Sequence, residues 1–294
     1  MRAGSLEARF RFEAQRLASI EGRREADSMK CPICLRDLDR TAVETGDVTV
    51  EHIVPRKLGG RSTTLTCRRC NNTQGSRLDR HIVEAARSRD ASEGHGTFRT
   101  TVSVGGSSLQ ADLAWTPDRS AANVITIIPG ASDPRQVQAV QDSMVDGAEV
   151  RMSFSYGYVP NRLWLGLLRA AYLGVFRTLG PSYALDPSVA WVRRQITEKD
   201  PPSPHLTRIV RMMKTPPDAA RHDVVPLDLK VKHRADRHVY LVLVQTRAKL
   251  TTTHAVALPR AGSGDAGRPE ILADVLDEIG GKTLVVRPRS SDGG

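Results

Sequence analysis

The sequence predicts an α+β protein that combines a short cysteine-containing module with a C-terminal domain whose sheet is mostly antiparallel. All four cysteines of the 294-residue chain lie in one short stretch near the N-terminus, among short β-prone and helical segments. From residue 97 onward, several successive segments alternate apolar with polar residues, which indicates strands. Runs of strands with separate helices are typical of α+β folds.

An amphipathic helix is expected over residues 5–24, within an N-terminal element of residues 1–28. The expected apolar face consists of Leu6, Phe10, Ala14, Leu17 and Ile20. Arg9, Arg16 and Arg23 recur on another side of this helix, where they either face water or contact phosphate.

The cysteine-containing module is expected over residues 29–90, in the order strand, loop, strand, helix. Its helix is predicted to begin at Asn71 or Asn72 and to run toward residue 86. The C-terminal domain is expected over residues 97–294; the sequence leaves its role open between target recognition, oligomerisation through a dimer interface, and sensing. Its predicted strands are 97–104, 109–115, 123–129, 149–155, 207–213, 224–232, 238–246, 250–258 and 282–287, and its predicted helices are 134–146, 161–178, 186–196 and 269–279.

The cysteines form two pairs of Cys-x-x-Cys spacing, Cys31 with Cys34 and Cys67 with Cys70. Two such pairs present four thiolates, which bind Zn²⁺ tetrahedrally. A module of this size buries little apolar surface, so the metal is expected to supply much of its folding free energy. The sequence therefore predicts a structural zinc site, and four unrelated thiols are the alternative.

Glu51 and His52 lie between the two cysteine pairs, in the string Glu-His-Ile-Val-Pro. A neutral imidazole takes a proton from water near neutral pH, and a carboxylate holds a hard divalent cation that polarises a phosphodiester. Asn71 follows Cys70 near the expected helix start, where an amide oxygen can ligate a metal and exposed N–H groups favour phosphate. These three residues are expected to form a hydrolytic site; a purely structural Glu-His pair on a zinc-stabilised hairpin is the alternative.

The string Glu-His-Ile-Val-Pro, the later Gly-Gly pair and Thr-Leu-Thr-Cys-x-x-Cys-Asn resemble the HNH endonucleases over about residues 29–85. The match is similar to the subgroup whose treble-clef-like ββα-metal finger is clamped by four cysteines, in an HNN-like variant. This resemblance implies that His52 is the general base and that Glu51 and Asn71 hold a Mg²⁺ or Mn²⁺ ion. It also implies a structural zinc ion on the four cysteines, and cleavage of phosphodiester bonds to a 5′-phosphate and a 3′-hydroxyl.

Two positions depart from the family pattern. Thr64 stands where the family usually has an Asn before a Leu, and Gln74 stands where it usually has a Lys. Thr64 or its neighbour Thr63 is expected to take over the hydrogen bonding of that Asn as part of the catalytic site. Decay of the nuclease into a zinc-stabilised nucleic-acid-binding protein is the alternative that these departures leave open.

The net charge of +10 favours a polyanionic partner. Nucleic acid, above all double-stranded DNA, is the expected partner; no membrane partner is expected, and the sequence is compatible with a homodimer. The N-terminus lacks the apolar stretch of a secretory signal, so a cytoplasmic protein is expected. A protein-interaction surface with a purely structural zinc ion is a further alternative. The expected phosphate contacts are Arg56, Lys57, Arg61, Arg68, Arg69 and Arg77.

Overall fold

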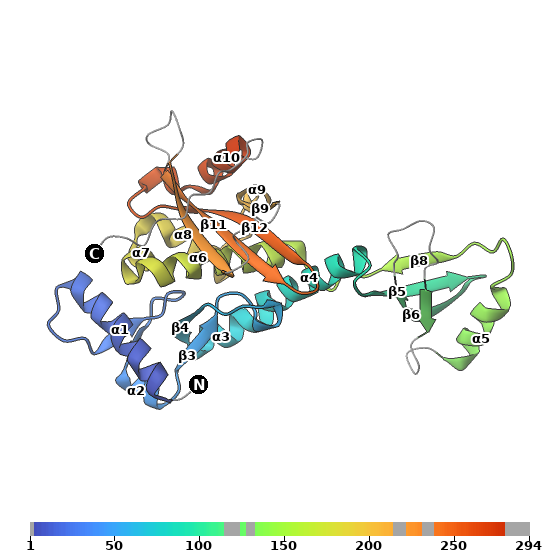
Figure 1. Cartoon of the computed structure of the whole chain (residues 1–294), viewed down its shortest axis with the longest axis horizontal. Helices are drawn as coiled ribbons and strands as arrows, with labels where there is room; N and C mark the ends of the chain where they lie inside the picture. Colours follow the sequence, from blue (N-terminus) through green and yellow to red (C-terminus); the bar gives the residue numbers. More distant parts are fainter. Residues whose placement is uncertain (1–2, 115–123, 128–132, 214–221, 231–237, 280–294) are drawn as a thin grey trace. The chain divides into compact units, whose positions relative to one another are not determined.

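The computed structural model describes residues 3–114, 124–127, 133–213, 222–230 and 238–279 (Figure 1). Helices and antiparallel sheets make up this part of the chain, which contains no barrel, so the predicted α+β class is confirmed. The predicted division into residues 1–28, 29–90 and 97–294 concerns parts that fold independently, and it stays a prediction. Contacts divide the chain into unit 1, Met1–Val83, Pro160–Arg247 and Thr251–Gly294, and unit 2, Glu84–Val159 and Ala248–Leu250.

Unit 1 begins with the amphipathic helix α1, Ala3–Glu21. Phe10, Ala14 and Leu17 are buried as predicted, whereas Ile20 is 47% exposed. Ile20 lies in the last turn of α1, so the predicted apolar face ends one turn earlier than expected. Three short elements that the sequence did not indicate follow: β1 (Ser28–Lys30), β2 (Asp37–Asp39) and α2 (Arg40–Glu44).

The predicted order of strand, loop, strand and helix is present in the next segment. β3 (Val48–His52) pairs antiparallel with β4 (Thr63–Cys67), and the short 3₁₀ turn η1 (Arg56–Leu58) lies in the loop between them. Helix α3 begins at Arg68, three residues before the first predicted start, because the Cys67 sulfur accepts the N–H of Cys70 and caps the helix. The helical path is α3 (Arg68–Gln74), the π-helical turn η2 (Gly75–Asp79) and α4 (Arg80–Ser92).

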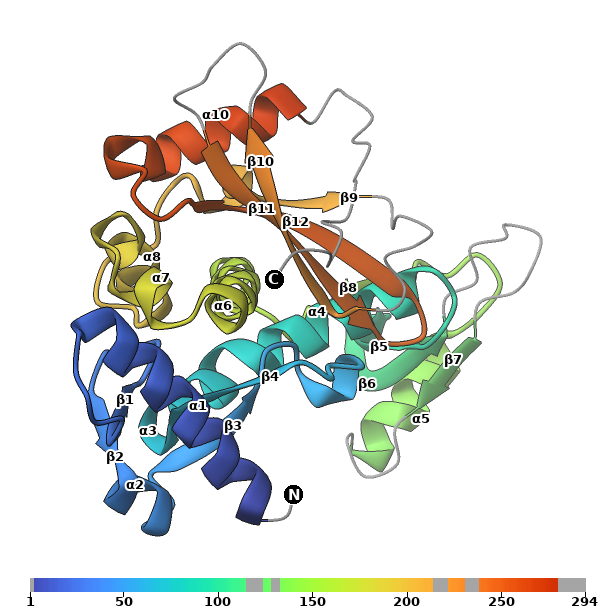
Figure 2. The same ribbon diagram turned by 60° about the vertical axis from the view of Figure 1, so that its left-hand side comes forward.

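The second half of unit 1 is a four-stranded antiparallel sheet with the order β10-β11-β12-β9. Figure 2 shows α6 and α10 on opposite sides of this sheet, and β11 is accordingly buried along almost its whole length. The predicted strand 207–213 is wrong in its first part, where the helix α9 stands, and the predicted strand 282–287 lies outside the described residues. The elements are α6 (Pro160–Leu179), α7 (Pro181–Leu185), η3 (Pro187–Val189), α8 (Ala190–Ile196), α9 (Leu206–Ile209), β9 (Val210–Met213), β10 (Val224–Lys230), β11 (His238–Arg247), β12 (Thr251–Pro259), η5 (Gly264–Gly267) and α10 (Pro269–Ile279).

Helix α6 joins the two halves of unit 1. It packs against β10, β11 and β12 on one side and against β4 and η2 on the other (Figure 2). An unbroken run from Leu165 to Phe176 is buried, as its apolar sequence predicts. None of the helices that the structure describes has the length and hydropathy needed to cross a membrane.

Unit 2 contains a second antiparallel sheet, with the order β7-β6-β5-β8. Helix α5 covers one face, and its Val140 packs into a small core with Val102 and Leu109. Unit 2 holds seven Lys and Arg against nine Asp and Glu, so the positive excess of the chain belongs to unit 1. The elements are β5 (Thr97–Val104), β6 (Ser107–Ala114), β7 (Val124–Ile127), α5 (Pro134–Ser143) and β8 (Arg151–Phe154).

Candidate active site

Glu51 and His52 are the last two residues of β3, and they lie opposite Thr64 and Thr63 of β4. Neighbouring residues of a strand point to opposite faces. Glu51 is accordingly buried, at 2% exposure, whereas His52 is half-buried and reaches the surface. Thr64, predicted to replace the missing Asn, is also buried. The two predicted catalytic side chains of β3 therefore lie in different environments.

The buried carboxylate of Glu51 forms an ion pair with Arg169 of α6. Arg169 Nη1 donates to Glu51 Oε1 at 2.5 Å, and Arg169 Nη2 donates to Asp79 Oδ1 at the end of η2. The Arg169 side chain is completely buried. Glu51 Oε2 is buried as well and has no hydrogen-bond partner among the described residues. The Arg169 guanidinium thus pairs with two carboxylates, and Glu51 Oε2 has no partner among the described residues.

Burial controls the protonation of these acids. It raises the pKa of the Glu51 carboxyl above its ordinary value, against the opposing charge of Arg169. Burial also raises the pKa of Asp79, which the charges of Arg169 and His52 oppose. Asp79 therefore interacts electrostatically with the predicted general base as well as with Arg169.

Asn71 lies in the first half of α3 and faces β3. Its Nδ2 donates to Thr49 Oγ1 at 3.0 Å and to the Val50 carbonyl at 3.2 Å. These bonds fix the amide beside the strand that carries Glu51. The Glu51 oxygen without a partner among the described residues and the Asn71 amide oxygen are both donors of the type that a hard divalent cation prefers, so their chemistry fits a Mg²⁺-class ion.

The four cysteines come together as the spacing predicts. Their sulfur atoms all lie within 4.8 Å of one another, and no disulfide links them. The N–H of Cys67 donates to Cys31 Sγ and the N–H of Cys70 donates to Cys67 Sγ, bonds that favour thiolate sulfur. Four converging sulfurs match tetrahedral Zn²⁺ coordination, so the cluster could hold a structural zinc ion.

The loop between β3 and β4 is held by residues that lie far away in the sequence. Asp223, at the start of β10, accepts the backbone N–H groups of Arg61 and Ser62, each at 2.8 Å. Arg177 of α6 donates to Ser62 Oγ at 2.9 Å. The tight Gly-Gly turn precedes these contacts, with Gly59 in the left-handed region at φ 78°.

The six predicted phosphate contacts are all exposed, but two of them have structural partners. Arg68 donates to the carbonyls of Gly46 and Thr45, and Arg77 pairs with Glu198. The side chains of the other four have no hydrogen bond or ion pair within the described chain; these are Arg56, Lys57, Arg61 and Arg69.

A basic cavity of about 400 Å³ lies beside the cysteine cluster. Arg36, Arg69, Arg77 and Lys199 contribute to its wall. Gln74, which replaces the usual Lys of the family, is buried at its edge. Several positive side chains around one hollow suit a phosphate-rich ligand.

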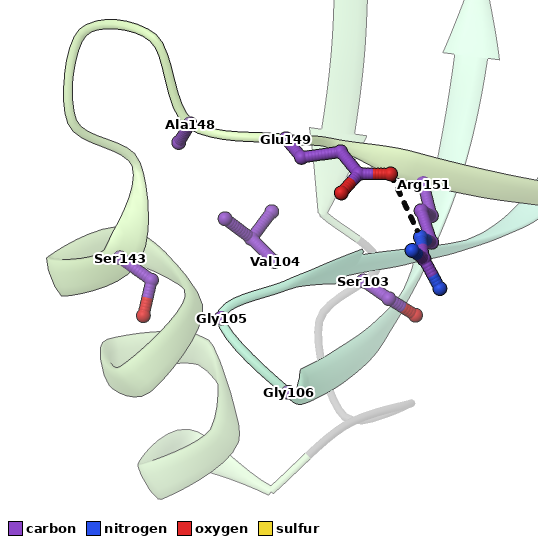
Figure 3. Close-up of a pocket in the computed structure, with 8 residues that line it drawn as sticks. All are labelled: Ser103, Val104, Gly105, Gly106, Ser143, Ala148, Glu149 and Arg151. Atoms are coloured by element: carbon purple, nitrogen blue, oxygen red, sulfur yellow. Dashed lines mark hydrogen bonds and ion pairs between the residues drawn. The ribbon is translucent and has the colours of Figure 1, made fainter.

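A hollow of about 480 Å³ in unit 2 is different in character (Figure 3). It lies beside the Gly105-Gly106 turn, which Ser143 of α5 approaches from one side. Its two charged groups, Glu149 and Arg151, pair with each other at 3.0 Å. No residue predicted to be catalytic lines this hollow.

Residues 31–86 match the family model of the HNH endonucleases. The match includes both cysteine pairs and the Glu51-His52 pair, so this segment is an HNH endonuclease domain, which implies a nucleic-acid substrate. No curated protein and no solved structure gives a significant match to the chain.

Three residues that contact the site were not singled out by the sequence: Asp79, Arg169 and Asp223. Asp223 follows no motif that could have revealed it. Arg169 had one signal, because a cation in the middle of a strongly apolar helix needs a buried counter-charge. That signal does not identify which acids supply the counter-charge.

Proposed function

We propose that this protein is a metal-dependent HNH endonuclease that hydrolyses phosphodiester bonds of nucleic acid, with double-stranded DNA as its main substrate. The observation that carries the proposal is the match of residues 31–86 to the HNH endonucleases, together with the convergence of the four cysteines. The basic cavity and the positive excess of unit 1 support a polyanionic substrate. Reduced cysteines that bind zinc suit the cytoplasm.

In the proposed reaction, His52 takes a proton from a water molecule, whose oxygen forms a bond to phosphorus while the bond from phosphorus to the 3′-oxygen breaks. The leaving 3′-oxygen takes a proton from solvent water, so the products are a 5′-phosphate and a 3′-hydroxyl. Glu51 and Asn71 would hold a Mg²⁺ or Mn²⁺ ion. When bound, such an ion polarises the phosphate and offsets the charge on the leaving oxygen.

His52 suits this role because it is the part of the Glu-His pair that reaches the surface. Thr64, across the ladder from Glu51, would help to hold β4 in register. Four exposed cations that have no ion pair or hydrogen bond within the described residues, Arg56, Lys57, Arg61 and Arg69, would contact backbone phosphates.

One observation favours a second function, a zinc-stabilised nucleic-acid-binding protein without cleavage. Glu51 already has one oxygen in an ion pair with Arg169 and is buried, so a catalytic ion would have only the second oxygen available. This function predicts salt-sensitive binding to nucleic acid that no divalent ion converts into cleavage.

Plasmid nicking and linearisation with Mg²⁺ or Mn²⁺ distinguish the two functions. Wild type, His52→Ala and an EDTA control are compared, with His95→Ala as a matched control because His95 is exposed and lies in unit 2. Metal-dependent cleavage by wild type and His95→Ala, lost at least about 100-fold in His52→Ala, is the expected result. A gel shift without cleavage by any protein would favour the binding function.

A further inference from the structure

A buried group of three charged residues, Glu51, Asp79 and Arg169, links the HNH domain to the rest of unit 1. Arg169 lies on α6, 118 residues from Glu51 and outside the matched segment. It is fully buried, so it cannot touch a substrate. Its Nη1 holds Glu51 Oε1 and its Nη2 holds Asp79.

When both acids are ionised, the charges of this group do not balance. Two carboxylates face one guanidinium, and Glu51 Oε2 has no hydrogen-bond partner among the described residues. A buried acid without full compensation carries a large desolvation penalty. A divalent cation next to Glu51 Oε2 would compensate the excess negative charge.

We propose that Arg169 and Asp79 are positioning residues for the ion-binding carboxylate of this nuclease, an inference that rests on the proposed function. Arg169 fixes Glu51 through Oε1, so that Oε2 is the atom presented to the ion. Asp79 holds the second arm of the same guanidinium and keeps the group negative enough to bind a cation. Helix α6 is therefore part of the active site, although it lies outside the HNH segment.

Helix α6 is attached to the HNH domain by two further contacts that do not involve Glu51. Tyr172 donates its hydroxyl proton to the Pro32 carbonyl at 2.5 Å, and Arg177 donates to Ser62 Oγ at 2.9 Å. Neither contact involves Arg169 or Asp79, so zinc content and melting temperature report whether α6 stays docked when one of these two residues is changed. This separates an effect on ion binding from a loss of the fold.

The test measures Mn²⁺ binding to the zinc-loaded full chain by electron paramagnetic resonance of free Mn²⁺, beside zinc content, melting temperature and plasmid cleavage. Asp79→Asn keeps the shape and removes one charge, and Arg169→Lys keeps the charge but cannot hold both acids. Arg177→Lys is the matched control, because it changes another α6 arginine that contacts the domain away from Glu51.

Asp79→Asn and Arg169→Lys are expected to weaken Mn²⁺ binding about tenfold or more, as loss of a residue that orients a metal ligand does. They are expected to raise the Mn²⁺ concentration needed for cleavage, with unchanged zinc content. Arg177→Lys is expected to bind Mn²⁺ like wild type. Such a pattern supports the inference even if cleavage is too weak to measure.

Equal Mn²⁺ affinity in wild type and in both variants would overturn the inference and leave the proposed nuclease function standing. Wild type that binds no Mn²⁺ and cleaves nothing would overturn both. If Asp79→Asn loses zinc or melts early, Arg169→Lys decides alone, since it keeps a cation between the two acids.

Discussion

Asp223 accepts a hydrogen bond of 2.5 Å from Ser62 Oγ, which joins the start of β10 to the loop before β4. The same carboxylate accepts the N–H groups of Arg61 and Ser62. Burial acts to raise the pKa of Asp223, but the hydrogen bonds from the Ser62 side chain and from these backbone groups outweigh it and lower the pKa below its ordinary value. The ionised carboxylate is therefore the form that holds the loop.

Asp223→Asn should lower the free energy of unfolding by about 2 kcal/mol at pH 7, because it weakens three hydrogen bonds to a charged acceptor. A carboxyl whose pKa is lowered by folding stabilises the protein above its unfolded pKa, and this contribution is lost as pH falls through the folded pKa. Urea unfolding of wild type and variant should therefore give the same difference from pH 8 to pH 5. A difference that already shrinks between pH 7 and pH 5 would contradict a lowered pKa.

Gly60 occupies a place in the same loop where no larger residue fits. A Cβ atom on it would lie 1.9 Å from the Val54 carbonyl oxygen, which is backbone and cannot rotate away. Gly60→Ala should therefore destabilise the domain by about 2 kcal/mol or more, measured by urea unfolding. Gly75→Ala is the matched control, since a Cβ there meets nothing within 4 Å; it should be neutral or stabilise by up to about 1 kcal/mol. Equal effects of the two changes would mean that the loop adjusts to a Cβ.

Local spacing predicted much of this architecture. Two Cys-x-x-Cys pairs predicted four sulfurs in one place, and the structure brings them within 4.8 Å. Period-two alternation predicted β5 at its observed limits, Thr97–Val104, and apolar periodicity predicted α10 at Pro269–Ile279. In these segments the side chains that set the pattern are near neighbours in the chain.

Contacts between distant segments could not be predicted in the same way. The apolar sequence of α6 indicated burial but did not identify its neighbours, so the pairing of Arg169 with Glu51 had no local signal. Glu51 was expected to hold an ion, and the sequence carried no signal that its place on the inner face of β3 would bury it. The strand predicted from residue 207 began too early, because α9 occupies Leu206–Ile209. This error has a local cause, since α9 ends in a β-branched residue that suits a strand as well as a helix.

Zinc removal should unfold the HNH domain selectively. Cys67→Ala removes one of four converging sulfurs and also the cap that accepts the Cys70 N–H, so zinc content should fall from about one per chain toward zero. Elemental analysis and limited proteolysis measure the two effects, with new cleavage expected within residues 31–86. Ser76→Ala, an exposed change on the same helical path, should keep both zinc and protection. Full zinc content in Cys67→Ala would exclude the four-sulfur site.

Arg69 and Lys199 line the basic cavity beside the cysteine cluster. If the nucleic-acid backbone lies there, Arg69→Gln should weaken DNA binding uniformly across sequences. It should also reduce the slope of the logarithm of the binding constant against the logarithm of the salt concentration by about 1, because one phosphate contact fewer means fewer counterions released on binding. Lys199→Gln should act in the same direction. Fluorescence anisotropy of a labelled duplex over a series of NaCl concentrations gives both slopes.

Arg135→Gln is the matched control for these two changes, because it removes the same charge from an exposed position on α5 of unit 2. Unit 2 carries more acidic than basic residues, so its surface should repel rather than attract DNA. The salt slope of Arg135→Gln should therefore equal that of wild type. If Arg135→Gln reduced the salt slope as much as Arg69→Gln does, unit 2 would also contact the nucleic acid. If Arg69→Gln and Lys199→Gln both left the slope unchanged, the basic cavity would not be part of the nucleic-acid interface.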